Sequence, residues 1–274
     1  MNAIITLTTD FGLADAYVAA MKGVILTINA AAKIVDICHN ISPQNVSQAA
    51  FVLNTAFQFF PEHTIHVVVV DPGVGTERRA ILLRTPRFDF VAPDNGALSY
   101  VIEPFLKEPP RRDRGQVKLP PELKAVSITR PEFWHSPASA TFHGRDIFAP
   151  VAARLSLGAS PEKFGEDIDA ITALPGHHPY RKSADTLVGR IVHIDHFGNL
   201  ITSFKLEDLP EEPFIVEASS RLISEMSRTY AEGEGLLALI GSSGYLEIAV
   251  KGGNARDFLK AVVGDEVKIR LKNR

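Results

Sequence analysis

Residues 64–70 constrain the fold more than any other stretch of this chain. The run is β-branched apart from His66, and such a run predicts a strand that is buried on both faces, as in a parallel sheet. Other strand-like runs cover residues 3–8, 33–38, 80–84 and 89–92, and helical spacing covers residues 14–28, 45–59, 95–103 and 147–157. This alternation of strand and helix predicts an α/β layered domain with a mostly parallel sheet.

The second half of the chain has a different pattern of apolar and turn-forming residues. Short strand-like runs are separated by glycine-rich turns, at residues 187–194, 201–204, 213–216, 236–240, 245–250 and 266–271. Such a pattern predicts a small antiparallel β-barrel or sandwich, of which we take the barrel as the expectation. We therefore expect an N-terminal α/β domain over residues 1–182 and a C-terminal β-barrel domain over 183–274. The proline-rich, charged segment 104–137 is expected to leave the compact core.

Charge and cysteine content exclude several classes of protein. The 29 Lys and Arg residues nearly balance the 32 Asp and Glu residues, which argues against a nucleic-acid-binding protein. The basic cluster Arg111, Arg112 and Arg114 is expected to be a solvated loop. The single cysteine, Cys38, allows no intrachain disulfide and suits a reducing compartment. With neither a signal peptide nor a membrane span in the sequence, we expect a cytoplasmic protein with no membrane partner.

Two acidic motifs follow predicted strands, where open α/β sheets bind ligands. Asp10 lies in Thr8-Thr9-Asp10-Phe11-Gly12, and two roles fit it: an acceptor for sugar hydroxyls or an N-cap for the next helix. Asp71 opens Asp71-Pro72-Gly73-Val74-Gly75. It suits a reactive carboxylate or a simple Asx turn.

Two basic side chains are candidates to act with Asp71. Arg78 lies seven residues later and is expected either to fold back onto Asp71 or to lie on the surface. His143 opens a helix in Phe142-His143-Gly144-Arg145-Asp146, where it suits a general base, a water-orienting group or a structural histidine. A metal site built on Asp71 and His143 is disfavoured, because the chain has no clustered histidine pattern.

The C-terminal half carries two turns that suit ligand binding. In the turn Asp195–Asn199, a buried Phe197 would stack on a flat heterocycle and Asn199 would read an amide-like edge; an ordinary Asx turn fits as well. The turn Gly241-Ser242-Ser243-Gly244 offers hydroxyl and N–H groups to a carboxylate, or is a plain hairpin turn.

Taken in order, these motifs resemble one family. The segments TTDFG, CHNISPQNV, VVDPGVGTERR, APDNGALS, FHGRDIFAPVAA, IDHFGNLITS and GSSGYLEIAV resemble the S-adenosyl-L-methionine hydrolases (adenosine-forming), or SAM hydroxide adenosyltransferases, which are relatives of fluorinase and chlorinase. The resemblance implies hydrolysis of S-adenosyl-L-methionine to adenosine and L-methionine without a cofactor or metal. It also implies a homotrimer with active sites between subunits.

The resemblance also implies residue roles. Asp71, Arg78 and His143 match the catalytic set of the hydrolases. The substrate contacts would be Asp10 to the ribose, Phe197 and Asn199 to adenine, and Asp15, Asp195 and Ser242 to the methionine ammonium and carboxylate.

Several positions distinguish this chain from the halogenating relatives. Those enzymes have a Tyr and a Thr in the turn that matches DPGVG, and a Ser at the position of Gly144, so water is the expected nucleophile here. They also have an Arg where this chain has Ser243. The alternative to an enzyme is a non-catalytic protein that binds S-adenosylmethionine or adenosine.

Overall fold

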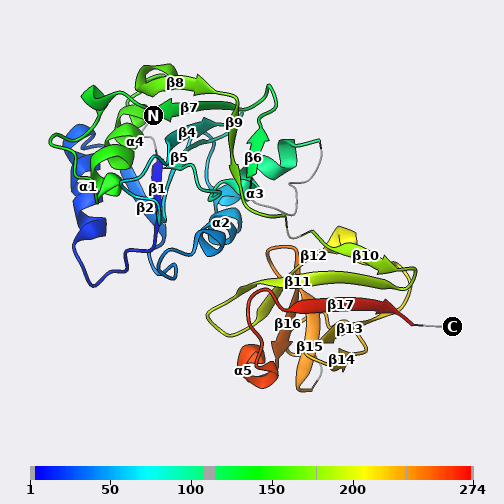
Figure 1. Ribbon diagram of the computed structural model, residues 1–274. Helices are drawn as coiled ribbons and strands as arrows, with labels where there is room; N and C mark the ends of the chain where they lie inside the picture. The colour runs from blue at the N-terminus through cyan, green and yellow to red at the C-terminus, as the bar shows by residue number, and fades with distance from the viewer. Residues whose placement is uncertain (1–3, 108–114, 177, 233, 273–274) are drawn as a thin grey trace. The chain divides into compact units, whose positions relative to one another are not determined.

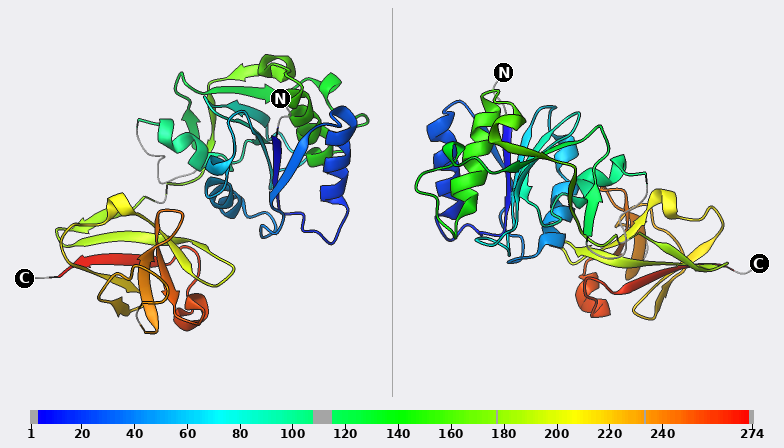
Figure 2. Two further views of the ribbon diagram at one scale, coloured as in Figure 1. Left: turned by 180° about the vertical axis from the view of Figure 1, so that it is seen from behind. Right: turned by 45° about the horizontal axis from the view of Figure 1, so that its top comes forward.

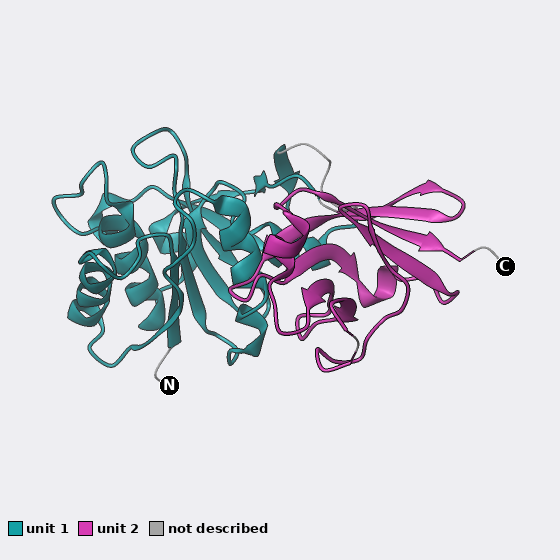
Figure 3. Cartoon of the chain, turned by 90° about the horizontal axis from the view of Figure 1, so that it is seen from below, with its two compact units in different colours: residues 1–176 teal, residues 177–274 magenta. Residues whose placement is uncertain are grey.

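The computed structural model describes residues 4–107, 115–176, 178–232 and 234–272. The chain divides into two compact units, residues 1–176 and 177–274 (Figure 3). The division falls at the cluster of Pro175, Gly176 and Pro179, just before strand β10 (Tyr180–Ser183). No helix in the described part of the chain is long and apolar enough to cross a membrane.

The first unit is built on a seven-stranded sheet of order β2-β1-β3-β5-β4-β7-β8 (Figure 1). Strands β1 (Ile4–Thr9), β2 (Lys33–Cys38), β3 (Ile65–Val69) and β5 (Asp89–Pro93) are parallel. Strands β4 (Ala80–Arg84), β7 (Lys124–Ile128) and β8 (Gly165–Ile168) follow in antiparallel pairs. Every residue of β3 is buried, which confirms the strand expected at residues 64–70.

Helices cover both faces of this sheet and confirm the layered α/β fold. One apolar core contains residues of α1 (Tyr17–Ile28) and α4 (Ala149–Ser156). The other contains residues of α2 (Val46–Asn54) and α3 (Ser99–Ile102). Helices α1 and α4 therefore lie on one face of the sheet, and α2 and α3 lie on the other (Figure 2).

Some predicted elements differ from the structure. Segment 104–137 contains β7, which is almost wholly buried between β4 and β8; the expectation of an excursion is wrong there, because five strand residues are hidden among prolines and charges. Strand β6 (Gly115–Lys118) pairs with β9 (Ala170–Ala173). The helix expected at 95–103 begins only at Ser99, because Gly96 has φ +98°, which lies outside the helical region. The cluster Arg111, Arg112 and Arg114 lies outside the described residues.

Helix ends also shift. Helix α1 starts at Tyr17 rather than residue 14, and α2 ends at Asn54, before a 3₁₀ turn over Phe57–Phe59. A π-helical turn, η4 (Gly144–Phe148), precedes α4. Single-turn π segments occur often at functional sites.

The second unit is an eight-stranded, nearly closed antiparallel barrel, as expected. The strand order is β14-β13-β17-β11-β12-β16-β15, and β10 pairs with β11. Its core includes the fully buried side chains of Phe204 in β12 and of Leu246 and Ile248 in β16. The elements after β10 are β11 (Thr186–Ile194), β12 (Leu200–Lys205), β13 (Phe214–Ala218), β14 (Arg221–Ile223), β15 (Leu236–Ile240), β16 (Tyr245–Val250), α5 (Ala255–Leu259) and β17 (Glu266–Leu271).

Candidate active site

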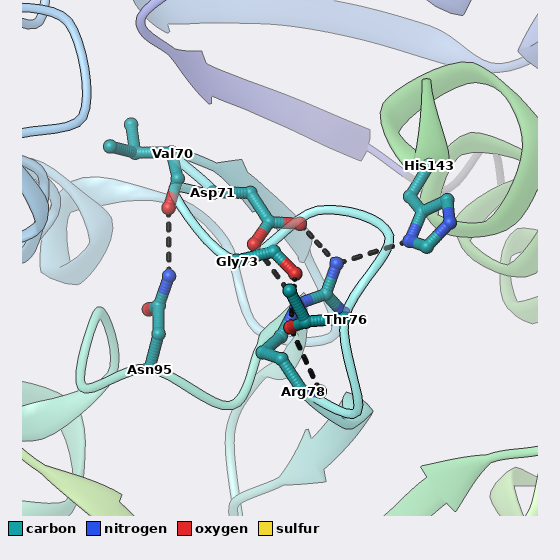
Figure 4. Close-up of polar contacts among 7 residues, drawn as sticks. All are labelled: Val70, Asp71, Gly73, Thr76, Arg78, Asn95 and His143. Carbon is teal, nitrogen blue, oxygen red and sulfur yellow. Dashed lines mark hydrogen bonds and ion pairs between the residues drawn. The ribbon is translucent and has the colours of Figure 1, made fainter. Parts of the chain in front are cut away.

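The turn after β3 carries Asp71 and folds back toward β4. Asn95 holds the end of the strand by donating its side-chain amide to the Val70 carbonyl, 2.8 Å away (Figure 4). Gly75 has φ +77°, and a Cβ there would lie 2.7 Å from the Ala140 carbonyl oxygen. Only glycine meets both conditions, so this turn depends on Gly75.

Arg78 forms a two-pronged ion pair with Asp71. Its Nε donates to Asp71 Oδ1 at 2.9 Å, and its Nη2 donates to Asp71 Oδ2. Both side chains are largely buried, at 8% and 5% exposure. The geometry confirms the expected pairing across the turn and excludes a surface role for Arg78. Such forked pairs fix orientation as well as charge.

His143 completes the cluster through the same guanidinium. Its Nδ1 lies 3.1 Å from Arg78 Nη2 (Figure 4). Because arginine has no acceptor, Nδ1 accepts this hydrogen bond, and a neutral His143 must carry its proton on Nε2. Burial and the charge of Arg78 lower the pKa of His143. The ring is therefore neutral at pH 7.

The loop before His143 is anchored by a buried carboxylate. Asp146 is fully buried and accepts hydrogen bonds from Arg145 Nε at 2.6 Å and from the Ser139 N–H at 2.8 Å. Burial raises the pKa of Asp146, but the hydrogen bonds from Arg145 and Ser139 outweigh it and keep that pKa below its ordinary value. The ionised carboxylate thus ties residues 139–146 together beside the site.

Asp10 lies at the end of β1 and binds backbone rather than a helix end. Its Oδ2 accepts a hydrogen bond from the Gln44 N–H at 2.8 Å. The N-cap of α1 is Ala16, so the helix-cap role considered for Asp10 is wrong. His39 binds the same loop at two points. Its Nδ1 lies 2.8 Å from Thr9 Oγ1, and its backbone carbonyl accepts a hydrogen bond from the Gly12 N–H.

Asp10, Asp71 and His143 line one cavity of about 530 Å³ in the first unit. Three aromatic rings line it too: Phe11, Tyr17 and Phe142. Sequence reasoning did not assign these rings to the site, although Phe11 and Phe142 flank the residues that it did. Asp15 is exposed on the segment before α1 and does not line this cavity.

The remaining predicted contacts lie in the second unit, in two turns. Asp195 Oδ1 accepts from the N–H groups of Phe197 and Asn199, and Oδ2 accepts from the Asn199 side-chain amide. This is the Asx turn that was considered. Phe197 is 73% exposed; the expectation of a buried ring is wrong, because the turn presents it to solvent. Ser242 is exposed in the other turn.

Glu247 lies beside Gly241 of the second turn and feels the charge of Asp195 in the first; the sequence reasoning did not assign it to the site. It is 6% exposed, and its Oε2 accepts from Tyr230 Oη at 2.6 Å. A Cβ on Gly241 would lie 1.7 Å from Glu247 Oε1, so glycine is required beside the carboxylate. Burial and the nearby Asp195 raise the pKa of Glu247, against the lowering effect of Tyr230. One glutamate in an apolar strand gives no sequence signal of such a role.

The described residues contain no cluster of three or more His, Cys, Asp or Glu side chains that could hold a metal ion. Between Asp71 and His143 the structure places a guanidinium instead.

Comparisons with known proteins bear on this site directly. The model of the SAM hydroxide adenosyltransferase N-terminal domain matches residues 5–165, and the model of the C-terminal domain matches residues 189–268. The chain belongs to the SAM hydroxide adenosyltransferase family. The N-terminal model spans Asp10, Asp71, Arg78 and His143, and the C-terminal model spans the two turns.

Individual relatives agree with this membership. The (R)-S-adenosyl-L-methionine hydrolase of Thermus thermophilus is 38% identical over 95% of this chain and 97% of its own length. A fluorinase of Nocardia brasiliensis is 28% identical over 90% of this chain and 89% of its own. The crystal structure of a conserved Thermotoga maritima protein has a TM-score of 0.84 and 34% identity, covering 97% of this chain and 99% of that one. Family membership thus extends over both units.

Proposed function

We propose that this protein hydrolyses S-adenosyl-L-methionine to adenosine and L-methionine, by attack of water at the ribose C5′. The observation that carries the proposal is the contact of Asp71, Arg78 and His143 at a cavity that also contains Asp10. The name of the Thermus relative supports the substrate and also specifies the R form at sulfur. We extend that preference to this chain.

The leaving group needs no help from an acid, because the sulfonium departs as a neutral thioether. Catalysis then depends on placing and activating the water, and in-line placement alone can supply several kcal/mol. In our proposal Asp71 accepts the proton of the water. His143 donates from Nε2 to the water oxygen and orients it, because its Nδ1 is engaged by Arg78.

Arg78 holds both partners of the water through one guanidinium. Its Nε and Nη2 bind Asp71, while Nη2 also binds His143. Its positive charge favours a hydroxide-like nucleophile over neutral water. We therefore propose a reaction that needs neither a metal nor another cofactor.

We propose that the substrate is held by groups from both units. Asp10 binds the ribose hydroxyls, with Gln44 fixing the carboxylate. Phe197 and Asn199 bind adenine, and Asp15, Asp195 and Ser242 hold the amino-acid end. Because these groups are divided between two units, we further propose a homotrimer with active sites shared between subunits. A cytoplasmic location completes the proposal and suits the free Cys38.

The halogenase alternative is disfavoured by the packing around Gly144. A Cβ at this position would lie 3.2 Å from both Met21 Sδ and Phe142 Cε2, and 3.3 Å from Phe11 Cε2. A serine there would need all three side chains to shift. A non-catalytic binder remains the second candidate, and the intact Asp71–Arg78–His143 cluster argues against it.

The test is incubation of the purified protein with (R)- and (S)-S-adenosylmethionine, with a chelator and without added halide. We expect equal amounts of adenosine and methionine, formed faster from the R form. Retention of intact substrate without products would support the binding protein instead. Loss of activity with the chelator would contradict the metal-free mechanism.

A further inference from the structure

The cavity contains an aromatic cluster that the hydrolytic mechanism does not use. Phe11, Tyr17 and Phe142 contact one another, with ring centroids 5.6 Å, 5.7 Å and 5.2 Å apart in the pairs Phe11–Tyr17, Phe11–Phe142 and Tyr17–Phe142. All three line the cavity that holds Asp71 and His143. We refer to these three residues as the ring cluster.

The ring cluster is not explained by core packing alone. Phe11 and Phe142 pack against the apolar core beneath α1 and α4. Tyr17 is 49% exposed and is not part of that core in the described structure. An aromatic ring that lines a cavity and keeps half of its surface free is available to a ligand.

The charged groups around the cavity indicate which kind of ligand group the Tyr17 ring could bind. Asp71 is already paired with Arg78, and Asp10 accepts from the Gln44 N–H. The Arg145 guanidinium lies 5.1 Å from the centre of Phe142, so this ring already contacts one cation. Aromatic faces attract cations that are weakly hydrated, and a trialkyl sulfonium is such a cation.

We propose that the ring cluster, through the half-exposed ring of Tyr17, binds the sulfonium of the substrate. This inference rests on the proposed function and identifies the group that recognises the charge of its substrate. In-line attack places the sulfur on the side of C5′ away from the water. The cavity that is lined by the proposed water-binding groups, Asp71 and His143, is also lined by Tyr17. The sulfur loses its charge as the C5′–S bond breaks, so the attraction is strongest before reaction and is absent in the products.

This difference in charge predicts a kinetic signature. A contact that stabilises the ground state more than the transition state lowers KM without raising kcat. Removing the ring should therefore raise KM and leave kcat unchanged or slightly higher. Neutral adenosine and methionine would leave the rings without this attraction.

The test compares the cationic substrate with its neutral thioether, S-adenosylhomocysteine, on Tyr17→Leu and on the matched control Tyr17→Phe. Leucine keeps apolar bulk without a π face, whereas phenylalanine keeps the face. We expect Tyr17→Leu to raise the Kd and KM for S-adenosylmethionine about tenfold, or about 1.4 kcal/mol. Its Kd for the thioether should change less than twofold, and Tyr17→Phe should match the wild type.

Equal losses for the two ligands in Tyr17→Leu would overturn the inference, because the ring would then be only an apolar wall. An unchanged Kd for S-adenosylmethionine would overturn it too. Phe142→Leu repeats the comparison on a second ring, should Tyr17→Leu fail to fold. Binding is measured by calorimetry on these variants in an Asp71→Ala background, so that the substrate is not consumed during the titration. A wild-type protein that does not hydrolyse the substrate would refute the proposed function and leave this binding test readable.

Discussion

At the residue scale, the site depends on which atom of His143 carries a proton. Asp71 and His143 stand at a predicted strand end and at a predicted helix start, and the family resemblance implied that they act with Arg78 as a set. The sequence could not predict the tautomer, which follows from the contact between Arg78 Nη2 and His143 Nδ1. That contact depends on packing between residues 65 positions apart in the chain.

Mutation of His143 can test whether the side chain acts as a hydrogen-bond donor or as a base. If His143 donates from Nε2, His143→Gln places an amide donor near the same point and should keep kcat within about tenfold of the wild type. His143→Ala should lose considerably more, as should Asp71→Ala. Steady-state kinetics on the three variants decides the matter, and equal loss in the Gln and Ala variants would contradict a donor role.

At the element scale, strands with strong β-branched or alternating character were predicted well, whereas β7 and α3 were not. Strand β7 is flanked by prolines and charges that conceal its five residues. Helix α3 is short because Gly96 has φ +98°, outside the helical region. Neither feature is visible in the hydrophobic pattern of the sequence.

Strand β3 carries a buried histidine that makes the fold sensitive to acid. His66 is fully buried, its Nδ1 contacts Thr6 Oγ1 at 2.8 Å, and burial lowers the pKa of His66 to about 3. The unfolded histidine protonates near pH 6.5, as an unperturbed histidine does. The stabilisation is therefore complete above that pH and is lost as the pH falls from about 6.5 to about 3.

We expect His66 to contribute a slope of up to about 1.4 kcal/mol per pH unit in the free energy of unfolding over that range. Urea unfolding between pH 7 and pH 4 should show a shallower pH dependence for His66→Phe, whose ring suits the surrounding phenylalanines. His196→Asn, which replaces an exposed histidine, is measured alongside as the matched control. Parallel curves for wild type and His66→Phe would contradict this account.

At the scale of the whole molecule, the sequence predicted both the layered α/β fold and the antiparallel barrel. The helical pattern of apolar residues ends where short strands separated by glycine-rich turns begin. The homotrimer was implied only by the family resemblance. The proposed substrate-binding residues are distributed over two units, and this distribution makes sharing between subunits a specific proposal.

Subunit sharing predicts complementation between inactive variants. Asp71→Ala disables a site through the first unit and Asn199→Ala through the second. Co-expressed together, they should recover about a quarter of the wild-type activity if subunits mix at random in a closed ring. Each variant expressed alone is the control. Purified mixed oligomers without any gain in activity would show that each site is built from one chain.

The central claim, that water attacks C5′, is tested most directly by running the reaction in water labelled with heavy oxygen. Mass spectrometry of the products measures where the label goes. The account predicts label in the 5′-hydroxyl of adenosine, none in methionine, and equal amounts of the two products. Unlabelled adenosine, or products from cleavage at another carbon of the sulfonium, would contradict it.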